Sequence, residues 1–449
     1  MPVDTVLYNA KLYVEGRILE GGLAVDNGKI VRIAKEANLP SATRRVDLRR
    51  LLVLPGIIDA HVHLRDQLRS PDEDFYTGTS AAVAGGITTV LDMPNNIPVT
   101  MSAASLRKRM QLAEPSILAD VGFFSAFPEN IEAIDEVVKE GAIAFKLYLT
   151  EQIGGLNIDD DKLLSQAFKK AGELDVPVAV HAEDRRMVED AVEAERKQGK
   201  NDVKAYLRAH SPEVEAEAVG RILGVAYDSN AHIHFCHISS KKSIILIHNA
   251  RNKGLRVSCE ATPHHLLLSN EKLRKLGTLA LTDPPFRNDN IRNELWDAVK
   301  EAKIDIVASD HAPHLMAHKV ALSVWNMKPG VPGLETMLSL LLTKVNEGQL
   351  TLGEVVRLTA EKPAEIFQLR GRGFLKEGYI ANLTVVDMHQ QSRVDPSQFY
   401  SKAKYSPFEG WSLKGLPVRT FINGCQVMKE GEIVADYGTG RILRKESPT

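Results

Sequence analysis

Short apolar segments alternate with helical segments through the middle of the chain, and this order constrains the fold more than any other feature. The spacing predicts strands at residues 56–63, 88–94, 117–125, 143–149, 176–183, 232–239, 256–263 and 305–312. Segments such as ENIEAIDEVVKEG and DDKLLSQAFKKAGEL separate them, with apolar residues at helical spacing. Eight strands, each followed by a helix or a loop, predict an α/β fold of the (β/α)8 TIM-barrel type. An open, doubly wound sheet alternates in the same way and stays an alternative.

The two ends of the chain differ from this middle. Residues 1–53 contain short strands of alternating polarity with the hairpin signal Asn27-Gly28, and residues 375–449 have the same texture with Asn423-Gly424. We therefore expect a small β-sandwich domain built from both termini. The barrel is expected to occupy residues 54–374 between them.

The composition excludes several classes of partner. Lys and Arg total 56 against 58 Asp and Glu, so the net charge of −2 gives no broad attraction to nucleic acid or to an anionic membrane. No apolar run approaches the roughly 20 residues of a membrane span, and the first residues do not resemble a secretory signal. The three cysteines form no disulfide framework. We expect a cytoplasmic protein that acts on a small molecule.

Ionisable residues gather where the predicted strands end. His61 and His63 lie two residues apart at the end of the first strand, so their imidazoles share one face. The later segments carry Lys146, His181, His237 and Asp310. In a barrel the carboxyl ends of the strands meet at one mouth, where the active sites of this fold lie. Imidazoles with a carboxylate suit zinc or a similar divalent ion.

Each of these residues has an ordinary explanation when it is taken alone. An H-x-H pair is often incidental, the Lys146 ammonium can reach solvent, and Asp310 can cap a helical turn. Independent explanations would scatter such residues along the chain. Their shared position at the strand ends favours a metal site.

The longest motifs point to a known family. These are PGIIDAHVHLRD, AGGITTVLDMPNN, FKLYLT, VHAE, FCHISS, ATPHHL, ASDHAPH and PGVPGLET. In this order they resemble the cyclic amidohydrolase branch of the amidohydrolase superfamily, and within it the dihydroorotase family. The similarity covers nearly the whole chain, including both terminal segments.

The resemblance implies a site with two zinc ions in each subunit. His61, His63 and Asp310 would hold one ion, and His181 and His237 the other. Lys146, carboxylated by CO₂ to N6-carboxylysine, would bridge both. A hydroxide between the ions would attack the ring carbonyl of a cyclic amide, with Asp310 as base and then acid. The implied reaction interconverts L-dihydroorotate and N-carbamoyl-L-aspartate in de novo pyrimidine (UMP) biosynthesis. The resemblance also suggests a homodimer or homotetramer.

The same resemblance implies a substrate site. Arg65, Asn95 and His314 would contact the exocyclic carboxylate, and backbone amides near Gly333 would meet the ring. The other explanation of Arg65 is a surface ion pair with Asp66 or Asp72. One departure is Asp283, which stands where the family usually has an asparagine that touches the ring. Whether this carboxylate contacts substrate stays open.

Two other readings remain. One is a related cyclic amidase, such as an allantoinase or a hydantoinase (dihydropyrimidinase). Arg65 and Asn95 are the residues that discriminate between this alternative and the dihydroorotase family. The second is a non-catalytic structural relative, which typically loses metal ligands. The remaining ionisable residues receive no metal role: Glu183, Glu260, His264 and His265 are candidates for the surroundings of the site, and His210, His232, His234, His248, His318 and His389 are interpreted as ordinary surface or core residues.

Overall fold

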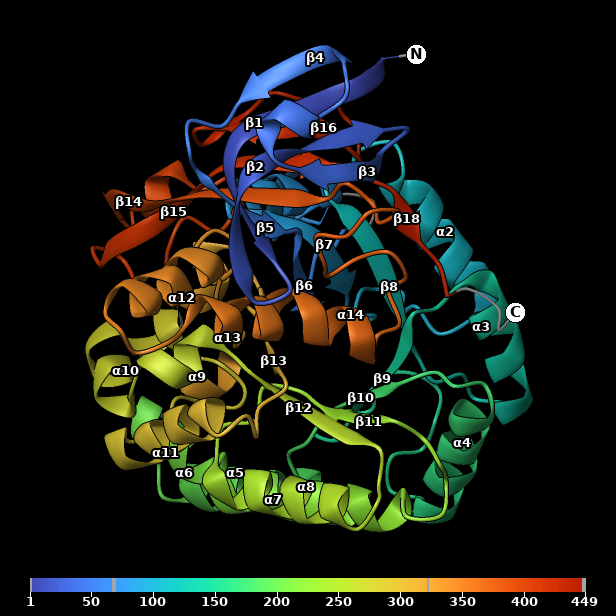
Figure 1. The fold of residues 1–449 in the computed structure, drawn as a ribbon. Coiled ribbons are helices and arrows are strands. Elements are labelled where there is room, and N and C mark those ends of the chain that lie inside the picture. Colours follow the sequence, from blue (N-terminus) through green and yellow to red (C-terminus); the bar gives the residue numbers. More distant parts are fainter. Residues whose placement is uncertain (1, 67–69, 321–322, 446–449) are drawn as a thin grey trace.

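The computed structural model describes residues 2–66, 70–320 and 323–445. The middle of the chain forms a parallel sheet in which each strand pairs with the next one along the sequence (Figure 1). Its strands are β6 (Ile57–Val62), β7 (Ile87–Asp92), β8 (Asp120–Ala126), β9 (Ala144–Tyr148), β10 (Val178–His181), β11 (Ile233–Phe235), β12 (Val257–Ala261) and β13 (Ile306–Val307). Every predicted strand of the barrel is present.

The sheet closes on itself. The amide of His63, just after β6, donates to the carbonyl of His311, just after β13, at 2.8 Å. A parallel bridge joins Val62 to the same residue. The first and last strands therefore meet, and the chain forms a TIM-type barrel. The alternative of an open doubly wound sheet is wrong.

Helices cover the outside of the barrel, which is why its strands are buried along their whole length. Several begin at a residue whose side chain accepts from the first turn, such as Asp74 before α1 and Ser102 before α2. The helices are α1 (Phe75–Ala84), α2 (Ala103–Ala113), α3 (Ile134–Glu140), α4 (Asp161–Glu173), α5 (Arg185–Lys197), α6 (Val203–Ala209), α7 (Pro212–Val225), α8 (Lys241–Asn252), α9 (Pro263–Leu267), α10 (Asn270–Leu276), α11 (Asp289–Lys300), α12 (Met337–Asn346), α13 (Leu352–Val356) and α14 (Lys362–Ile366).

Strands from both ends of the chain form a second sheet, in the order β17-β16-β15-β14-β5-β1-β2-β3, with β4 also paired to β1. It curls so that the β2–β3 hairpin meets the segment before β14, where Ile30 N donates to Tyr379 O at 2.8 Å. Its two halves enclose one apolar cluster, as a sandwich does. The strands are β1 (Val3–Val14), β2 (Arg17–Asp26), β3 (Lys29–Ala34), β4 (Ala42–Asp47), β5 (Leu52–Pro55), β14 (Leu383–Arg393), β15 (Ser412–Ile422), β16 (Cys425–Lys429) and β17 (Glu432–Ile433).

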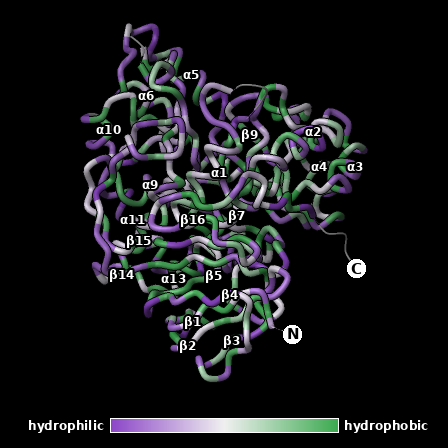
Figure 2. The backbone as a smooth tube through the Cα atoms, turned by 90° about the horizontal axis from the view of Figure 1, so that it is seen from above, coloured by the Kyte–Doolittle hydropathy of each residue, from purple (hydrophilic) through white to green (hydrophobic). Residues whose placement is uncertain are grey.

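The terminal sheet lies at one end of the molecule, and helices α5 and α6 lie at the opposite end (Figure 2). Two parts of the C-terminal segment leave the sheet. Strand β18 (Ile442–Leu443) pairs with β8 of the barrel, and residues 399–405 reach back to the barrel mouth. The exact boundaries at 53/54 and 374/375 stay predictions. Among the described residues, no helix has the length and apolar character needed to span a bilayer.

Candidate metal centre

Three of the predicted ligands converge at the mouth of the barrel. His61 and His63 come from the end of β6, and each places its Nε2 near Oδ1 of Asp310, at 3.4 and 3.3 Å. All three side chains are buried. Ligand atoms arranged tetrahedrally around zinc, at bond lengths of 2.0–2.1 Å, lie about 3.3 Å apart. The separations therefore match the edges of such a site.

Neighbouring acceptors fix the orientation of both rings. Nδ1 of His61 lies 2.5 Å from Oε1 of Glu260, and Nδ1 of His63 lies 2.7 Å from Oδ1 of Asn95. A ring that donates through Nδ1 presents a lone pair at Nε2. Burial lowers the pKa of His63 to about 4, so this ring is neutral near pH 7. Lone pairs that face a carboxylate repel it, and a cation between them removes the repulsion.

A second pair of ligands lies beside the first. Nδ1 of His181, at the end of β10, is 3.1 Å from Nε2 of His237, which follows β11. The rings of His61 and His237 are 5.3 Å apart, so the two groups form one cluster. The buried donor set is imidazole and carboxylate, which suits borderline divalent ions.

Lys146 is the least usual member of this cluster. Its side chain is 1% exposed, and Nζ donates to Sγ of Cys236 at 2.9 Å and lies 5.0 Å from the centre of the Tyr148 ring. Within the described ranges, no carboxylate lies at ion-pair distance from it. An ammonium buried without such a partner is costly, whereas a carbamate on the same nitrogen would supply two ligand oxygens. The residues present fit the predicted two-ion centre.

The predicted substrate residues line the mouth next to the metal centre. Nη2 of Arg65 lies 3.1 Å from Nε2 of His314, and the same ring nitrogen lies 3.0 Å from the carbonyl of Pro329. Nε of Arg65 is buried without a hydrogen-bond partner in the described part of the chain. No carboxylate of those residues comes within ion-pair distance of Arg65, so the predicted alternative of a pair with Asp66 or Asp72 is not formed.

Two other predicted residues are already engaged. Oδ1 of Asn95 is occupied by His63, which leaves the amide nitrogen of Asn95 for a ligand. The amide of Gly333 donates to Nδ1 of His311 at 3.2 Å, so this N–H is not free to meet a substrate ring. This hydrogen bond counts against Gly333 as a backbone donor to the substrate. That role of Gly333 stays a prediction.

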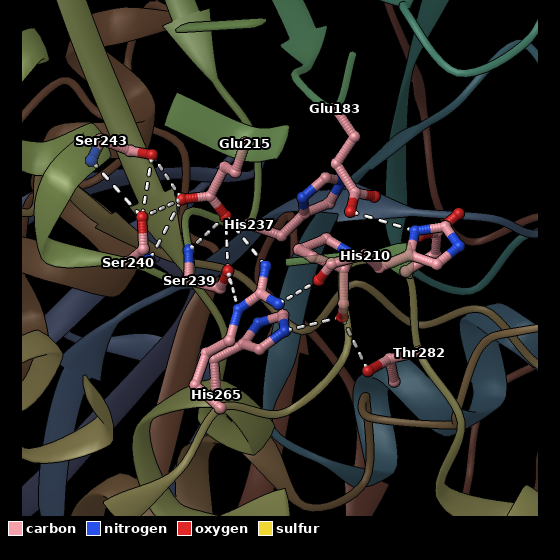
Figure 3. Close-up of polar contacts among 12 residues, drawn as sticks. Glu183, His210, Glu215, His237, Ser239, Ser240, Ser243, His265 and Thr282 are labelled. Carbon is pink, nitrogen blue, oxygen red and sulfur yellow. Dashed lines mark hydrogen bonds and ion pairs between the residues drawn. The ribbon is translucent and has the colours of Figure 1, made fainter. Parts of the chain in front are cut away.

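Glu183 and Glu260, which the sequence offers as candidates for the surroundings of the site, lie against predicted ligands, and Glu215 is a further residue that the sequence did not single out. Glu260 contacts His61 and also Nε2 of His234 at 3.1 Å, and Glu183 lies 3.2 Å from Nε2 of His181. Glu215 of α7 accepts from Ser239, Ser240 and Ser243, which fixes the loop after His237 (Figure 3). The sequence signal for Glu215 is its place within a largely apolar helical segment, because a glutamate that is buried there needs polar partners.

The carboxylate of Asp283 lies beside a buried histidine. Its Oδ1 lies 3.0 Å from Nδ1 of His210, which also contacts Glu183. The guanidinium of Arg287 instead bonds Ser239 and the carbonyl of His210. The carboxylate is thus neither paired with Arg287 nor alone.

Comparison with known proteins places this geometry in a family. Residues 52–427 match the amidohydrolase family. The chain belongs to this family. A dihydroorotase from Methanothermobacter thermautotrophicus is 37% identical over 96% of this chain and 95% of its own length. A dihydroorotase from Bacillus cytotoxicus is 35% identical over 94% of this chain and 97% of its own.

Amidohydrolases of another specificity are also similar. The solved structure of an L-hydantoinase (dihydropyrimidinase) from Arthrobacter aurescens matches with a TM-score of 0.94 and 29% identity, covering 98% of this chain and all of that one. A D-hydantoinase from Thermus sp. matches with a TM-score of 0.91 at 24% identity, which supports the fold alone. The chain is therefore an amidohydrolase related to enzymes that open cyclic amides, and the comparisons include more than one substrate.

Proposed function

We propose that this amidohydrolase is a zinc-dependent dihydroorotase that interconverts L-dihydroorotate and N-carbamoyl-L-aspartate in pyrimidine biosynthesis. The observation that carries the substrate is Arg65. Arg65 is half-buried beside His314 at the mouth, its buried Nε has no hydrogen-bond partner among the described residues, and a bidentate clamp of this kind suits a carboxylate. Dihydroorotate carries such a group outside its ring, whereas hydantoin and dihydrouracil do not. The dihydroorotases at 32–37% identity support the same substrate.

The chain's own residues account for the proton transfers. His61, His63 and Asp310 would hold one ion, His181 and His237 the other, and carboxylated Lys146 would bridge them. Divalent ions in this position would acidify a water and polarise the ring carbonyl. Asp310 takes the proton of the attacking water and gives it to the leaving ring nitrogen. Arg65, His314 and the amide of Asn95 orient the ring through its carboxylate.

A hydantoinase-type activity is the second candidate, and the L-hydantoinase structure with a TM-score of 0.94 favours it. The decisive experiment is hydrolysis of L-dihydroorotate by zinc-supplemented protein, with allantoin, hydantoin and dihydrouracil in parallel. We expect selective turnover of dihydroorotate. Turnover of a neutral ring instead would overturn the substrate and keep the metal chemistry. Metal below one equivalent per chain, without any turnover, would favour a non-catalytic relative.

The remaining parts of the proposal concern the cellular form. We propose a cytoplasmic homodimer or homotetramer that has no nucleic-acid or membrane partner. Light scattering of the purified protein tests the oligomeric state. The near balance of charge supports the proposed absence of nucleic-acid and membrane partners.

A further inference from the structure

Three polar side chains form a row behind the predicted metal ligand His181. Oε2 of Glu183 lies 3.2 Å from Nε2 of His181, on the side of the ring away from His237. The other oxygen of Glu183 lies 3.1 Å from Nδ1 of His210 (Figure 3). The same nitrogen lies 3.0 Å from Oδ1 of Asp283. The row thus runs from the metal centre to a carboxylate at the barrel mouth.

The members of the row come from separate parts of the chain. Glu183 follows β10, His210 follows α6, and Asp283 lies in the loop that precedes α11. Glu183 is 1% exposed and His210 is 7% exposed, while the side chain of Asp283 is 25% exposed. Two carboxylates this close repel each other strongly in a buried site unless a positive charge lies between them.

His210 is held so that it supplies this charge. Its ring stacks on Tyr206 with centroids 4.2 Å apart, and its carbonyl accepts from Arg287. Burial lowers the pKa of His210, but the carboxylates of Asp283 and Glu183 outweigh burial and raise this pKa to about 10. Nδ1 of His210 is hydrogen-bonded to Oε1 of Glu183 and lies 3.0 Å from Oδ1 of Asp283, so the charge of this ring lies between the two carboxylates.

We propose that His210 is a positioning residue for the metal ligand His181, and that it acts by holding Glu183 and Asp283 together. With Glu183 kept against Nε2, the ring of His181 presents Nδ1 toward His237. Loss of His210 leaves two uncompensated carboxylates, and Glu183 turns away from the ring. The inference rests on the proposed function, because it takes His181 as a metal ligand. It assigns the unusual Asp283 to this row rather than to contact with substrate.

The test is a set of variants that removes the charges in turn. In His210→Gln we expect the second zinc equivalent to bind about 10- to 100-fold more weakly, as for other groups that orient a ligand. Asp283→Asn alone leaves one carboxylate with His210 and changes the affinity by less than about threefold, because the row keeps its cation. The double variant His210→Gln/Asp283→Asn recovers most of the lost affinity. His389→Gln, an exposed histidine on the terminal sheet, is the matched control.

Zinc affinity is measured by chelator competition on the whole protein, with metal content and kcat and KM measured alongside. We expect kcat to fall in His210→Gln while KM changes less. Wild-type affinity in His210→Gln, or a double variant no better than that single one, overturns the inference. If His210→Gln does not fold, the double variant decides, since it is expected to fold and bind both ions within about threefold of wild type.

The outcomes separate this inference from the proposed function. A wild type that binds two ions but does not turn over dihydroorotate overturns the substrate alone, because the zinc measurements need no substrate. A wild type that binds fewer than two ions overturns the metal centre and this inference together. Recovery in the double variant supports the inference whichever cyclic amide is hydrolysed.

Discussion

The ring nitrogen that carries the hydrogen in His61 and in His63 decides which nitrogen of each ring can bind a metal ion. Glu260 and Asn95 take the Nδ1 hydrogens of His61 and His63, so both Nε2 atoms face Asp310. In Asp310→Asn we expect kcat to fall at least about a hundredfold, because the proton shuttle is lost, while at least one zinc equivalent remains bound. Steady-state kinetics and metal analysis check this. A near-normal rate would contradict the acid and base role.

We predict that Arg65 distinguishes dihydroorotate from neutral cyclic amides. Among the described residues its Nε has no hydrogen-bond partner and its Nη2 contacts His314, so a ligand carboxylate would complete its bonding. In Arg65→Gln we expect KM for dihydroorotate to rise roughly 10- to 100-fold, the worth of charged hydrogen bonds. KM for a neutral cyclic amide should change little. An equal rise for both rings would mean that Arg65 does not bind the carboxylate.

Lys146 has no carboxylate partner among the described residues, which is why we propose a carbamate on its side chain. In Lys146→Ala we expect loss of zinc and of activity. Short carboxylic acids should restore part of both, because they supply the missing oxygens. Zinc content is measured on protein purified in the same buffer as the wild type. Unchanged zinc content would count against the carbamate.

Among the elements, the loop before α12 depends on a carboxylate. Glu335 accepts from the amides of Tyr400 at 2.8 Å and Ser401 at 3.3 Å, so it joins this loop to residues 399–405. Burial raises the pKa of Glu335 from 4.5 to about 7, and the charge of Glu73 adds to the rise. Between about pH 4.5 and about pH 7, the folded state therefore keeps a proton on Glu335 that the unfolded state has lost. The stabilisation of the folded state by this proton is complete below about pH 4.5 and is lost as the pH rises through about 7.

We therefore expect the Tm of the wild type to fall more between about pH 5.5 and about pH 8 than that of Glu335→Gln, which cannot ionise. Differential scanning calorimetry of both proteins in matched buffers measures this. Glu347→Gln, an exposed glutamate at the end of α12, serves as control and should follow the wild type. Equal slopes for Glu335→Gln and wild type would contradict the assignment.

The sequence predicts the elements whose signal lies within a few neighbouring residues. Each barrel strand was predicted because it is a short apolar run, and the terminal sheet because of its hairpin signals. The row behind His181 was not predicted, because His210 and Asp283 lie far apart in sequence and meet only through the loops around α6 and α11. Strand β18 was also missed, since a two-residue strand has no periodicity.

In the whole molecule, one buried carboxylate joins the barrel to the C-terminal segments. Asp120 of β8 accepts from Arg372 and Asn382, both at 2.8 Å, and from the amide of Arg441 at 2.9 Å. In Asp120→Ala we expect a loss of about 3–5 kcal/mol in the free energy of unfolding, because Arg372 is left without its partner. Urea unfolding followed by tryptophan fluorescence measures it.

The control for this change is the exposed ion pair of Glu20 and Arg50, whose side chains are 62% and 61% exposed. Glu20→Ala should cost less than about 1 kcal/mol, since solvent screens such a pair. Losses of the same size in both variants would mean that Asp120 does not hold the molecule together.

The terminal sheet also sets the order in which the molecule can be completed. Strand β5 lies between β1 and β14, and β14 leaves the ribosome roughly 330 residues later, after the whole barrel. At about 5–20 residues per second, translation takes roughly 16 to 66 s to reach it. One edge of β5 stays unpaired during that time and can join other nascent chains. We therefore expect a chain truncated within the barrel to aggregate more readily than the full chain, because only the full chain can cover this edge.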